Sequence, residues 1–326
     1  MINPQHIESY TFFGLQKGPS VLVLGGIHGD ENCGSKAIKK INEFLINNNI
    51  TILSGNLTMI PVSNPLAASL NTRNGERNLN RNFYPKSNPQ DFEDHLNNVL
   101  CPILSNHEVI LDLHSFKVGK HPFALIKSVD KDHSIELNFT GEIKTVYEKT
   151  LAGWLGVSTV VGNWTETYER GVSRRVKEKS NDGNFNKISN LDPKYGVGTT
   201  EFSREKGAIA VTLECGQHRD PMSEKFAFNA ILGVLTGLGM IKSKTSKSKN
   251  DDVRYVSLFE VYDKQNISDF LLDQWKNFDF LKKDAEIASR KNGVRILAPE
   301  DCYILFPNKN ATPGNEWFYL ARKFTK

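Results

Sequence analysis

The sequence predicts an α/β fold followed by a small β-rich region. Over the first 240 residues or so, short apolar runs alternate with amphipathic stretches, which is the pattern of strands and helices covering one another. Beyond residue 252 only short β-like runs occur. A chain of 326 residues with 39% hydrophobic residues is long enough to bury a large core.

The first predicted strand covers residues 21–24 and ends in Gly25-Gly26. Apolar residues at helical spacing predict a helix over 31–45. Residues 109–113 are apolar apart from Asp112, as in a central strand that is covered on both faces. The other predicted elements are strands at 57–62, 157–161, 208–213, 254–261, 294–297 and 303–306, and helices at 89–106, 134–155 and 226–241.

Two segments interrupt this pattern. Residues 162–207 are polar, rich in Arg, Lys, Asn and Gly, and too long for an ordinary connection, which predicts a functional loop or lid. Residues 243–252 (SKTSKSKNDD) have the composition of a linker. The predicted organisation is a catalytic domain at 1–242, a linker at 243–252 and a β-rich C-terminal domain at 253–326.

Composition excludes several classes of function. The net charge of +4 comes without a basic stripe interleaved with aromatic residues, so we expect no nucleic-acid partner. No GxGxxG or P-loop sequence follows a predicted strand. No stretch predicts a signal peptide or a membrane span, and four cysteines without a CxxC pair favour a reducing compartment. We therefore expect a cytoplasmic protein; its oligomeric state is left open.

The segment GGIHGDE follows the first predicted strand and places His28 and Glu31 at the start of a helix. Ligands bind at strand-end loops of α/β sheets, and glycine lets such a loop turn sharply. Imidazole and carboxylate are both normal zinc ligands, and a spacing of three residues allows one turn to present both. His28 and Glu31 are therefore candidate metal ligands.

His114 ends the apolar strand ILDLH, and Glu214 ends another apolar strand in AVTLECGQ. Two histidines and one glutamate complete a catalytic zinc set that leaves one position open for water. Asp112 lies on the same face of the strand as His114 and can orient that ligand. A carboxylate beside a metal, here Glu214, can move a proton from water to a leaving nitrogen.

The stretch NTRNGERNLNRNFYP supplies three arginines and several asparagines within a few residues. Arginine recognises carboxylates through two parallel hydrogen bonds and can stabilise an oxyanion. The stretch lacks periodicity, which predicts a loop without choosing its role. The residues that it offers are Arg73, Arg77, Arg81, Asn78 and Asn80.

Taken in order, these motifs resemble the succinylglutamate desuccinylase/aspartoacylase family, a branch of the zinc carboxypeptidase clan. The matching segments are GGIHGDE, NPLA…TRNGERNLNRNF, ILDLHS and GTTEFSREKG…VTLECGQH. The resemblance implies a zinc-carboxypeptidase-like fold, with a mixed central sheet flanked by helices and a small C-terminal β-rich domain closing over the site.

The resemblance also implies roles for individual residues. The family uses one zinc ion per chain, a general base and acid, an arginine that polarises the scissile carbonyl, and a pair that binds the substrate carboxylate. The matching residues are His28, Glu31 and His114 for the metal, Glu214 and Arg73 for catalysis, and Asn80 and Arg81 for the substrate.

The function predicted in this way is a zinc-dependent amidohydrolase that cleaves the N-acyl amide bond of a small, anionic N-acyl amino acid by zinc-activated water. Two alternatives stay open: a metallocarboxypeptidase acting on a short peptide, and a zinc-binding protein of the same fold without turnover. The family's substrate-binding tyrosine has two candidates here, Tyr303 and Tyr319. The acyl group and the amino acid are not predicted.

Overall fold

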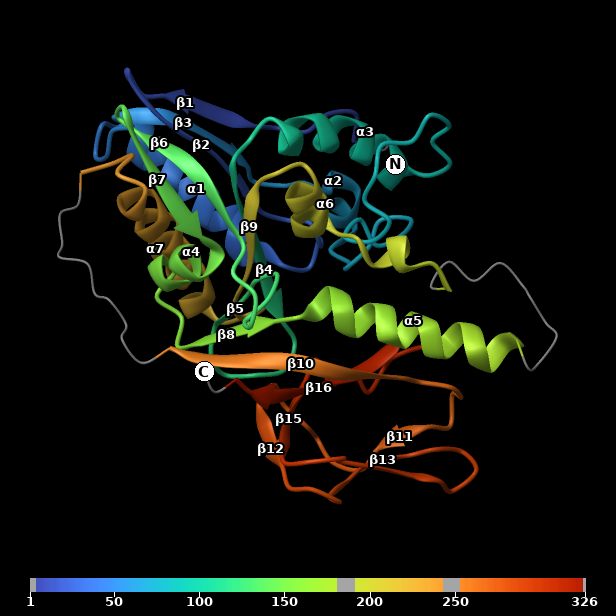
Figure 1. Cartoon of the computed structure of the whole chain (residues 1–326). Coiled ribbons are helices and arrows are strands. Elements are labelled where there is room, and N and C mark those ends of the chain that lie inside the picture. The colour runs from blue at the N-terminus through green and yellow to red at the C-terminus, as the bar shows by residue number, and fades with distance from the viewer. Residues whose placement is uncertain (1–3, 181–190, 243–252, 325–326) are drawn as a thin grey trace.

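The computed structural model describes residues 4–180, 191–242 and 253–324 (Figure 1). The predicted linker at 243–252 lies outside these residues. The described strands form an eleven-stranded sheet in the order β1-β3-β2-β4-β9-β5-β8-β10-β16-β15-β12, together with a three-stranded and a two-stranded sheet. Strands β3, β2, β4 and β9 run parallel to one another, whereas β1 pairs antiparallel with β3 and β5 pairs antiparallel with β9. The sheet is therefore mixed, as predicted.

The strands and helices predicted up to residue 113 occur in the predicted order. Helix α1 and strand β4 start within a residue of their predicted first positions. The bounds here are β1 Tyr10–Phe13, β2 Gln16–Leu24, α1 Asn32–Ile46, β3 Ser54–Ile60, α2 Pro65–Leu70, α3 Phe92–Ser105, β4 Val109–Phe116, β5 Phe123–Leu125, β6 Ser134–Phe139, β7 Glu142–Tyr147, α4 Glu148–Trp154 and β8 Thr159–Gly162.

The second half continues with four helical segments and most of the antiparallel strands. Its bounds are α5 Trp164–Ser180, the 3₁₀ helix η2 Pro193–Gly196, α6 Thr199–Glu205, β9 Ile209–Gln217, α7 Pro221–Gly237, β10 Arg254–Asp263, β11 Phe270–Leu271, β12 Asp279–Leu281, β13 Glu286–Ser289, β14 Arg295–Leu297, β15 Cys302–Leu305 and β16 Glu316–Lys323.

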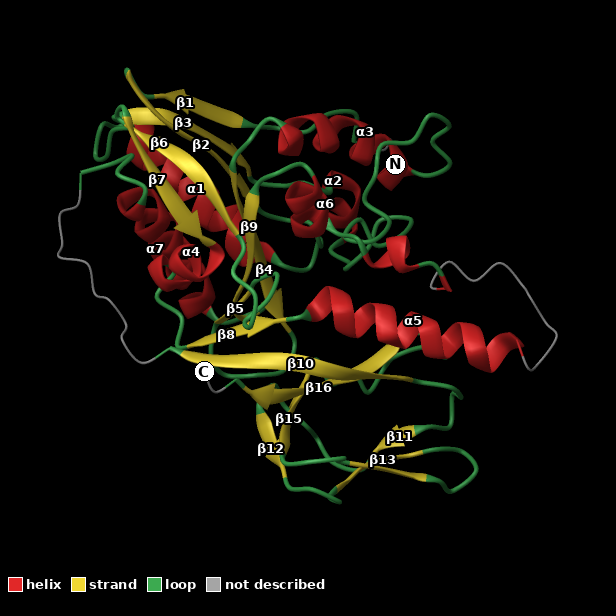
Figure 2. Cartoon of the chain, in the orientation of Figure 1, coloured by secondary structure: helices red, strands yellow, loops and turns green. Residues whose placement is uncertain are grey.

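Helices cover both faces of the central strands (Figure 2). Because side chains alternate along a strand, Val21 and Val23 of β2 join a core with α1, α4 and α7, whereas Leu22 and Leu24 join a core with α3 and α6. Helix α7 corresponds to the helix predicted at 226–241. Among the described residues, no helix combines the length and apolar character needed to cross a membrane.

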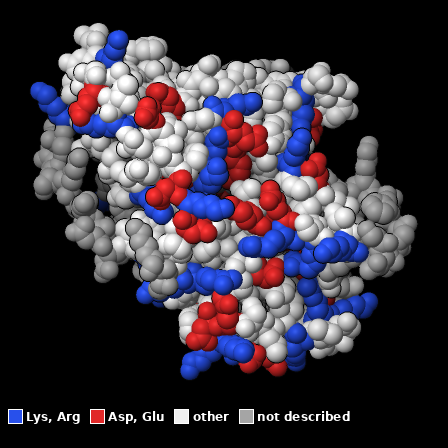
Figure 3. Space-filling model, viewed as in Figure 1, with Lys and Arg blue, Asp and Glu red and all other residues white. Residues whose placement is uncertain are grey.

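The C-terminal strands continue the main sheet. Strand β10 pairs in parallel with β8 and antiparallel with β16, and smaller cores with their own aromatic residues lie around these strands. The predicted β-rich character of this region is confirmed, while the division into two domains stays a prediction. On the face seen in Figure 3, basic and acidic side chains are interspersed.

Two predicted segments have a different structure. The helix predicted at 134–155 is instead the hairpin β6–β7 followed by the short helix α4. Thr140 and Gly141 turn the hairpin with φ of 52° and 101°, a backbone conformation that a helix does not allow. The segment predicted as an irregular lid at 162–207 contains α5, η2 and α6. Helix α5 packs along β10 (Figure 1).

Candidate functional site

The candidate site lies at the edge where the parallel strands end. In the register of the sheet, Leu24 of β2 lies beside Asp112 of β4, and His114 lies beside Glu214 of β9. The loop between β2 and α1 carries His28 and crosses this edge. At Gly29 an added Cβ would lie 2.0 Å from the carbonyl group of Ala67, so only glycine lets the loop pass so close to α2.

His28, Glu31 and His114 form one buried cluster. Nδ1 of His28 lies 2.9 Å from Oε1 of Glu31, and Nδ1 of His114 lies 3.0 Å from Oε2 of the same carboxylate. The three side chains are 2%, 2% and 3% exposed, and their potential ligand atoms lie within 4.8 Å of one another. The structure thus brings the three predicted metal ligands together.

The outer nitrogen of each ring faces an oxygen. Nε2 of His28 lies 3.1 Å from Oδ1 of Asn78. Nε2 of His114 lies 2.9 Å from Oδ2 of Asp112, within ion-pair distance although not aligned for a hydrogen bond. Oxygen acceptors at this position favour the proton on Nε2, which leaves the lone pair of each Nδ1 facing the carboxylate of Glu31. The two lone pairs and the carboxylate would then repel one another, and a cation bound between them would remove this repulsion.

The charges around the cluster also favour a bound cation. Burial opposes a charge on His114, but Asp112 and Glu31 raise the pKa of its imidazole well above the ordinary value. Burial, followed by the charge of Arg73, lowers the pKa of His28 to about 4. The carboxylates therefore favour a positive charge at this position, which a metal ion on Nδ1 would supply in place of a second ring proton.

Glu214 has the surroundings of a proton acceptor. Its Oε2 is buried and has no hydrogen-bond partner among the described residues. Burial, and next the negative charge of Glu31, raise the pKa of Glu214 to about 7. A carboxyl group with a pKa near neutrality can both take up and release a proton.

The arginines of the loop between α2 and α3 have different roles. Arg73 donates to Oε1 of Glu31 at 2.9 Å, and its side chain is 45% exposed. Arg77 instead donates to Asp91 and Asp94 at 2.8 Å each, which ties the loop to the start of α3. Arg77 is therefore a structural anchor, whereas Arg73 lies at the mouth of the cluster.

Asn80 contacts the start of α6, and Arg81 lies near the C-terminal strand β16. Oδ1 of Asn80 accepts a hydrogen bond from the backbone of Thr199 at 2.9 Å. The guanidinium of Arg81 lies 5.2 Å from the ring centre of Trp164 and 4.0 Å from Oε1 of Glu316. The two predicted substrate-binding residues thus follow Asn78, which contacts His28, by two and three positions.

The two candidate tyrosines differ in their surroundings. Tyr319 is 4% exposed, its hydroxyl has no hydrogen-bond partner among the described residues, and it interacts electrostatically with Arg81. Tyr303 instead packs against Phe280 and Arg254. The structure therefore places Tyr319 in the neighbourhood of Arg81, and leaves Tyr303 within the C-terminal strands.

Sequence reasoning gave no role to three residues beside the cluster. Asn78 was one of several asparagines in its loop, and only the fold shows that it contacts His28. Ser115 donates its backbone N–H to Oε2 of Glu31 at 3.1 Å, and its hydroxyl lies 2.7 Å from Nδ1 of His218. A signal for His218 existed in its position four residues after Glu214. With Asp30 and Glu31 it forms a second, less buried group of potential ligands.

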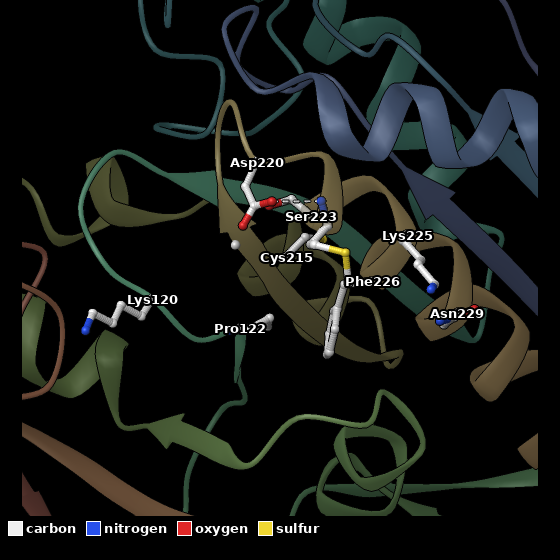
Figure 4. A pocket seen from close by; sticks show the side chains of 10 residues that line it. Lys120, Pro122, Cys215, Asp220, Ser223, Lys225, Phe226 and Asn229 are labelled. Atoms are coloured by element: carbon white, nitrogen blue, oxygen red, sulfur yellow. Dashed lines mark hydrogen bonds between the residues drawn. The ribbon is translucent and has the colours of Figure 1, made fainter.

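A separate cavity lies on the α7 side of the sheet. It has a volume of about 230 Å³ and lies between the loop after β4, which provides Lys120 and Pro122, and the start of α7 with Ser223 and Phe226 (Figure 4). Cys215 also lines it, although its neighbour Glu214 does not. The cavity thus contains none of the predicted site residues.

A mixed α/β sheet that carries two histidines and a glutamate at its strand ends defines an α/β protein with a candidate metal centre. Residues 17–144 match the model of the succinylglutamate desuccinylase/aspartoacylase catalytic domain. Over these residues the chain is similar to the catalytic domain of the family that its motifs predicted. No curated protein sequence matches the chain.

Solved structures share the fold over nearly the whole chain. Succinylglutamate desuccinylase from Vibrio cholerae has a TM-score of 0.70 at 17% identity, covering 97% of this chain and 85% of its own. The succinylglutamate desuccinylase/aspartoacylase from Rhodobacter sphaeroides has a TM-score of 0.66 at 18% identity, covering 98% and 90%. The product-bound ectoine utilization protein EutE (DoeB) from Ruegeria pomeroyi has a TM-score of 0.63 at 16% identity, covering 94% and 85%.

Proposed function

We propose that this protein is a zinc-dependent amidohydrolase that cleaves the N-acyl amide bond of an N-acyl amino acid. The observation that carries the proposal is the buried convergence of His28, Glu31 and His114, with Glu214 on the adjacent strand. The match of residues 17–144 to the succinylglutamate desuccinylase/aspartoacylase catalytic domain supports the reaction class.

Zinc fits the residues that are present. Two imidazoles and one carboxylate are the ligands of catalytic zinc sites that keep a position open for water or substrate. The oxygens of Asn78 and Asp112 face the outer ring nitrogens, an arrangement that turns Nδ1 of each ring toward a metal. We infer one zinc ion per chain. When bound, zinc supplies a Lewis acid that polarises a carbonyl group and lowers the pKa of water.

The side chains of the protein would perform the remaining tasks. Glu214, buried and with one unpartnered oxygen, would accept a proton from water and deliver it to the leaving nitrogen. Arg73, partly exposed beside Glu31, would donate to the oxygen of the scissile carbonyl. Asn80 and Arg81 would bind the carboxylate of the amino acid.

The proposed substrate is therefore a small anionic N-acyl amino acid. Desuccinylases and aspartoacylases among the structural relatives support this class. The four cysteines are free and buried, which favours a reducing compartment, and we propose a cytoplasmic location.

The decisive experiment combines metal analysis with an activity panel. Purified protein should contain about one zinc per chain, and should release free amine from at least one member of a panel of N-acetyl and N-succinyl amino acids. Glu214→Gln should keep its zinc and lose turnover, whereas Glu136→Gln, a change of an exposed glutamate in β6, should retain both. A zinc-loaded wild type that hydrolyses no member of the panel would contradict the proposal.

Mass spectrometry of a peptide mixture tests the peptidase alternative. An N-acyl amidohydrolase should leave free peptides intact, because its substrate pocket must accommodate one amino acid. Progressive shortening of peptides from the C-terminus, without release of amine from the acyl panel, would replace the proposed activity by carboxypeptidase activity.

A further inference from the structure

The corner around Arg81 contains more charge than the recognition of one carboxylate requires. Glu316, at the start of β16, lies 4.0 Å from Arg81 and 3.9 Å from Arg175 of α5. Both separations exceed hydrogen-bond distance, and the Glu316 side chain is 21% exposed. The carboxylate of Glu316 is therefore partly accessible and still able to accept hydrogen bonds.

The two other arginines near Arg81, Arg174 and Arg175, already form ion pairs with carboxylates. Arg175 forms two hydrogen bonds with Asp263 of β10, at 2.9 Å and 2.7 Å. Arg174 donates to Glu260 at 2.8 Å. Each of these arginines thus has its own carboxylate on β10, and neither has an uncompensated charge to offer a substrate.

Two buried hydroxyls line the same corner. Tyr168 is 1% exposed and Tyr319 is 4% exposed, and neither hydroxyl has a hydrogen-bond partner among the described residues. Both interact electrostatically with Arg81 and with Glu316. Buried hydroxyls normally have a partner, so these two indicate a polar ligand that would bind between Arg81 and Glu316.

The charges give an order of preference among substrates. Within these ion pairs, Arg81, Arg174 and Arg175 contribute +3 and Glu260, Asp263 and Glu316 contribute −3, a balance of zero. A substrate carboxylate bound to Arg81 changes the net charge of this group to −1. Glu316 then no longer has Arg81 as its own counter-ion. A side-chain ammonium on the same substrate returns the net charge to zero, whereas a second carboxylate takes it to −2. Removing charge compensation in a partly buried site is unfavourable.

We propose that Glu316 is a specificity-determining residue that selects N-acyl amino acids with a cationic side chain over those with an acidic one. The inference rests on the proposed function. In this arrangement Arg81 binds the α-carboxylate, Glu316 accepts a hydrogen bond from the side-chain ammonium, and the hydroxyls of Tyr168 and Tyr319 complete the polar contacts.

The test compares Nα-acetyl-lysine and Nα-acetyl-ornithine with Nα-acetyl-methionine and Nα-acetyl-glutamate. Wild-type kcat/KM should be at least about tenfold higher for the cationic substrates than for the acidic one, the change expected from one charge-assisted hydrogen bond. Glu316→Gln should lose that preference mainly through a higher KM for the cationic substrates, so that their kcat/KM falls to about that of the methionine derivative measured with the same variant. Glu300→Gln, at an exposed ion pair with Arg322, is the matched control.

Binding to Glu214→Gln, measured by calorimetry with the same four compounds, gives a second test that needs no turnover. Tighter binding of the cationic compounds, lost in the Glu214→Gln/Glu316→Gln double variant, would support the assignment even if the scissile bond were of another type. Wild-type preference for Nα-acetyl-glutamate, or a preference for cationic compounds unchanged by Glu316→Gln, would overturn it. Failure of every acyl compound to be hydrolysed would count against the proposed function alone.

Discussion

Glu148→Gln tests how much of the fold depends on one buried carboxylate. Glu148 is the first residue of α4 and is 2% exposed. Its Oε1 accepts from Nε of Arg204 at 2.8 Å and from the backbone N–H of Ala210 at 3.1 Å, and also faces Nδ1 of His133 at 3.1 Å. Its Oε2 accepts from the backbone N–H of Lys127 at 2.7 Å. The carboxylate therefore joins α4 to α6, β9 and the segment after β5.

The magnitude follows from the pKa of Glu148. Burial opposes its ionisation, but Arg204, His133 and the backbone donors lower the pKa of Glu148 from 4.5 to about 2. A shift of about 2.5 units, at 1.36 kcal/mol per unit, corresponds to about 3 kcal/mol of stability. Glutamine keeps the shape of the side chain but removes the charge and turns an NH₂ group toward a donor. We expect Glu148→Gln to lower the free energy of unfolding by about 3 kcal/mol at pH 7, measured by urea denaturation followed by circular dichroism.

The pH dependence of the stability difference tests whether the charge of Glu148 is its cause. Because the pKa of Glu148 is lower in the folded chain, its contribution is fully present above pH 4.5 and is lost as the pH falls toward 2. The difference between wild type and Glu148→Gln should therefore shrink from pH 5 to pH 3, whereas Glu136→Gln, on an exposed strand position, should differ little from wild type throughout. A difference below about 1 kcal/mol at pH 7, or one that is the same at pH 3, would refute the reasoning.

Two further predictions concern the candidate metal centre. Gly29→Ala should displace His28 and Glu31, because its Cβ would lie 2.0 Å from the backbone of Ala67; zinc content measured by plasma mass spectrometry should fall well below one ion per chain, whereas Gly153→Ala, whose Cβ meets nothing within 4 Å, should leave it unchanged. Removal of metal with a chelator should lower the midpoint of thermal unfolding, since a ligand present at 1,000 times its Kd stabilises the folded chain by about 4 kcal/mol. An unchanged midpoint after complete loss of metal would argue against a site formed only in the folded protein.

The cluster itself could be predicted from the sequence because its signals are local. His28, Glu31, His114 and Glu214 each follow an apolar strand, and the ends of parallel strands meet at one edge of a sheet. The residues that surround the cluster carried no comparable signal. Arg77 and Arg81 are four residues apart in the same polar loop, yet one anchors the loop to α3 and the other faces Glu316, which comes from the opposite end of the chain.

The hairpin β6–β7 shows why periodicity alone predicted the wrong secondary structure for residues 134–155. Ile135, Leu137, Val146 and Leu151 all contact the same core, but they do not keep one spacing: Ile135 and Leu137 are two residues apart, as in a strand, whereas Val146 and Leu151 are five apart. The choice is made by Thr140-Gly141, where the chain reverses with positive φ. Similarly, α5 is polar over most of its length, and its place in the fold comes from ion pairs between Arg174 and Arg175 and residues of β10.

The pairing of β8 with β10 has a consequence for synthesis of the chain. Strand β8 ends at Gly162, but its partner β10 begins only at Arg254. While the chain emerges from the ribosome, the unpaired N–H and C=O groups of β8 and the apolar side of Val161 remain open to other chains for as long as the intervening residues take to be made. Strand β10 thus pairs with the edge of β8 that is exposed during synthesis. This edge is protected from aggregation only after the C-terminal part of the chain has been translated.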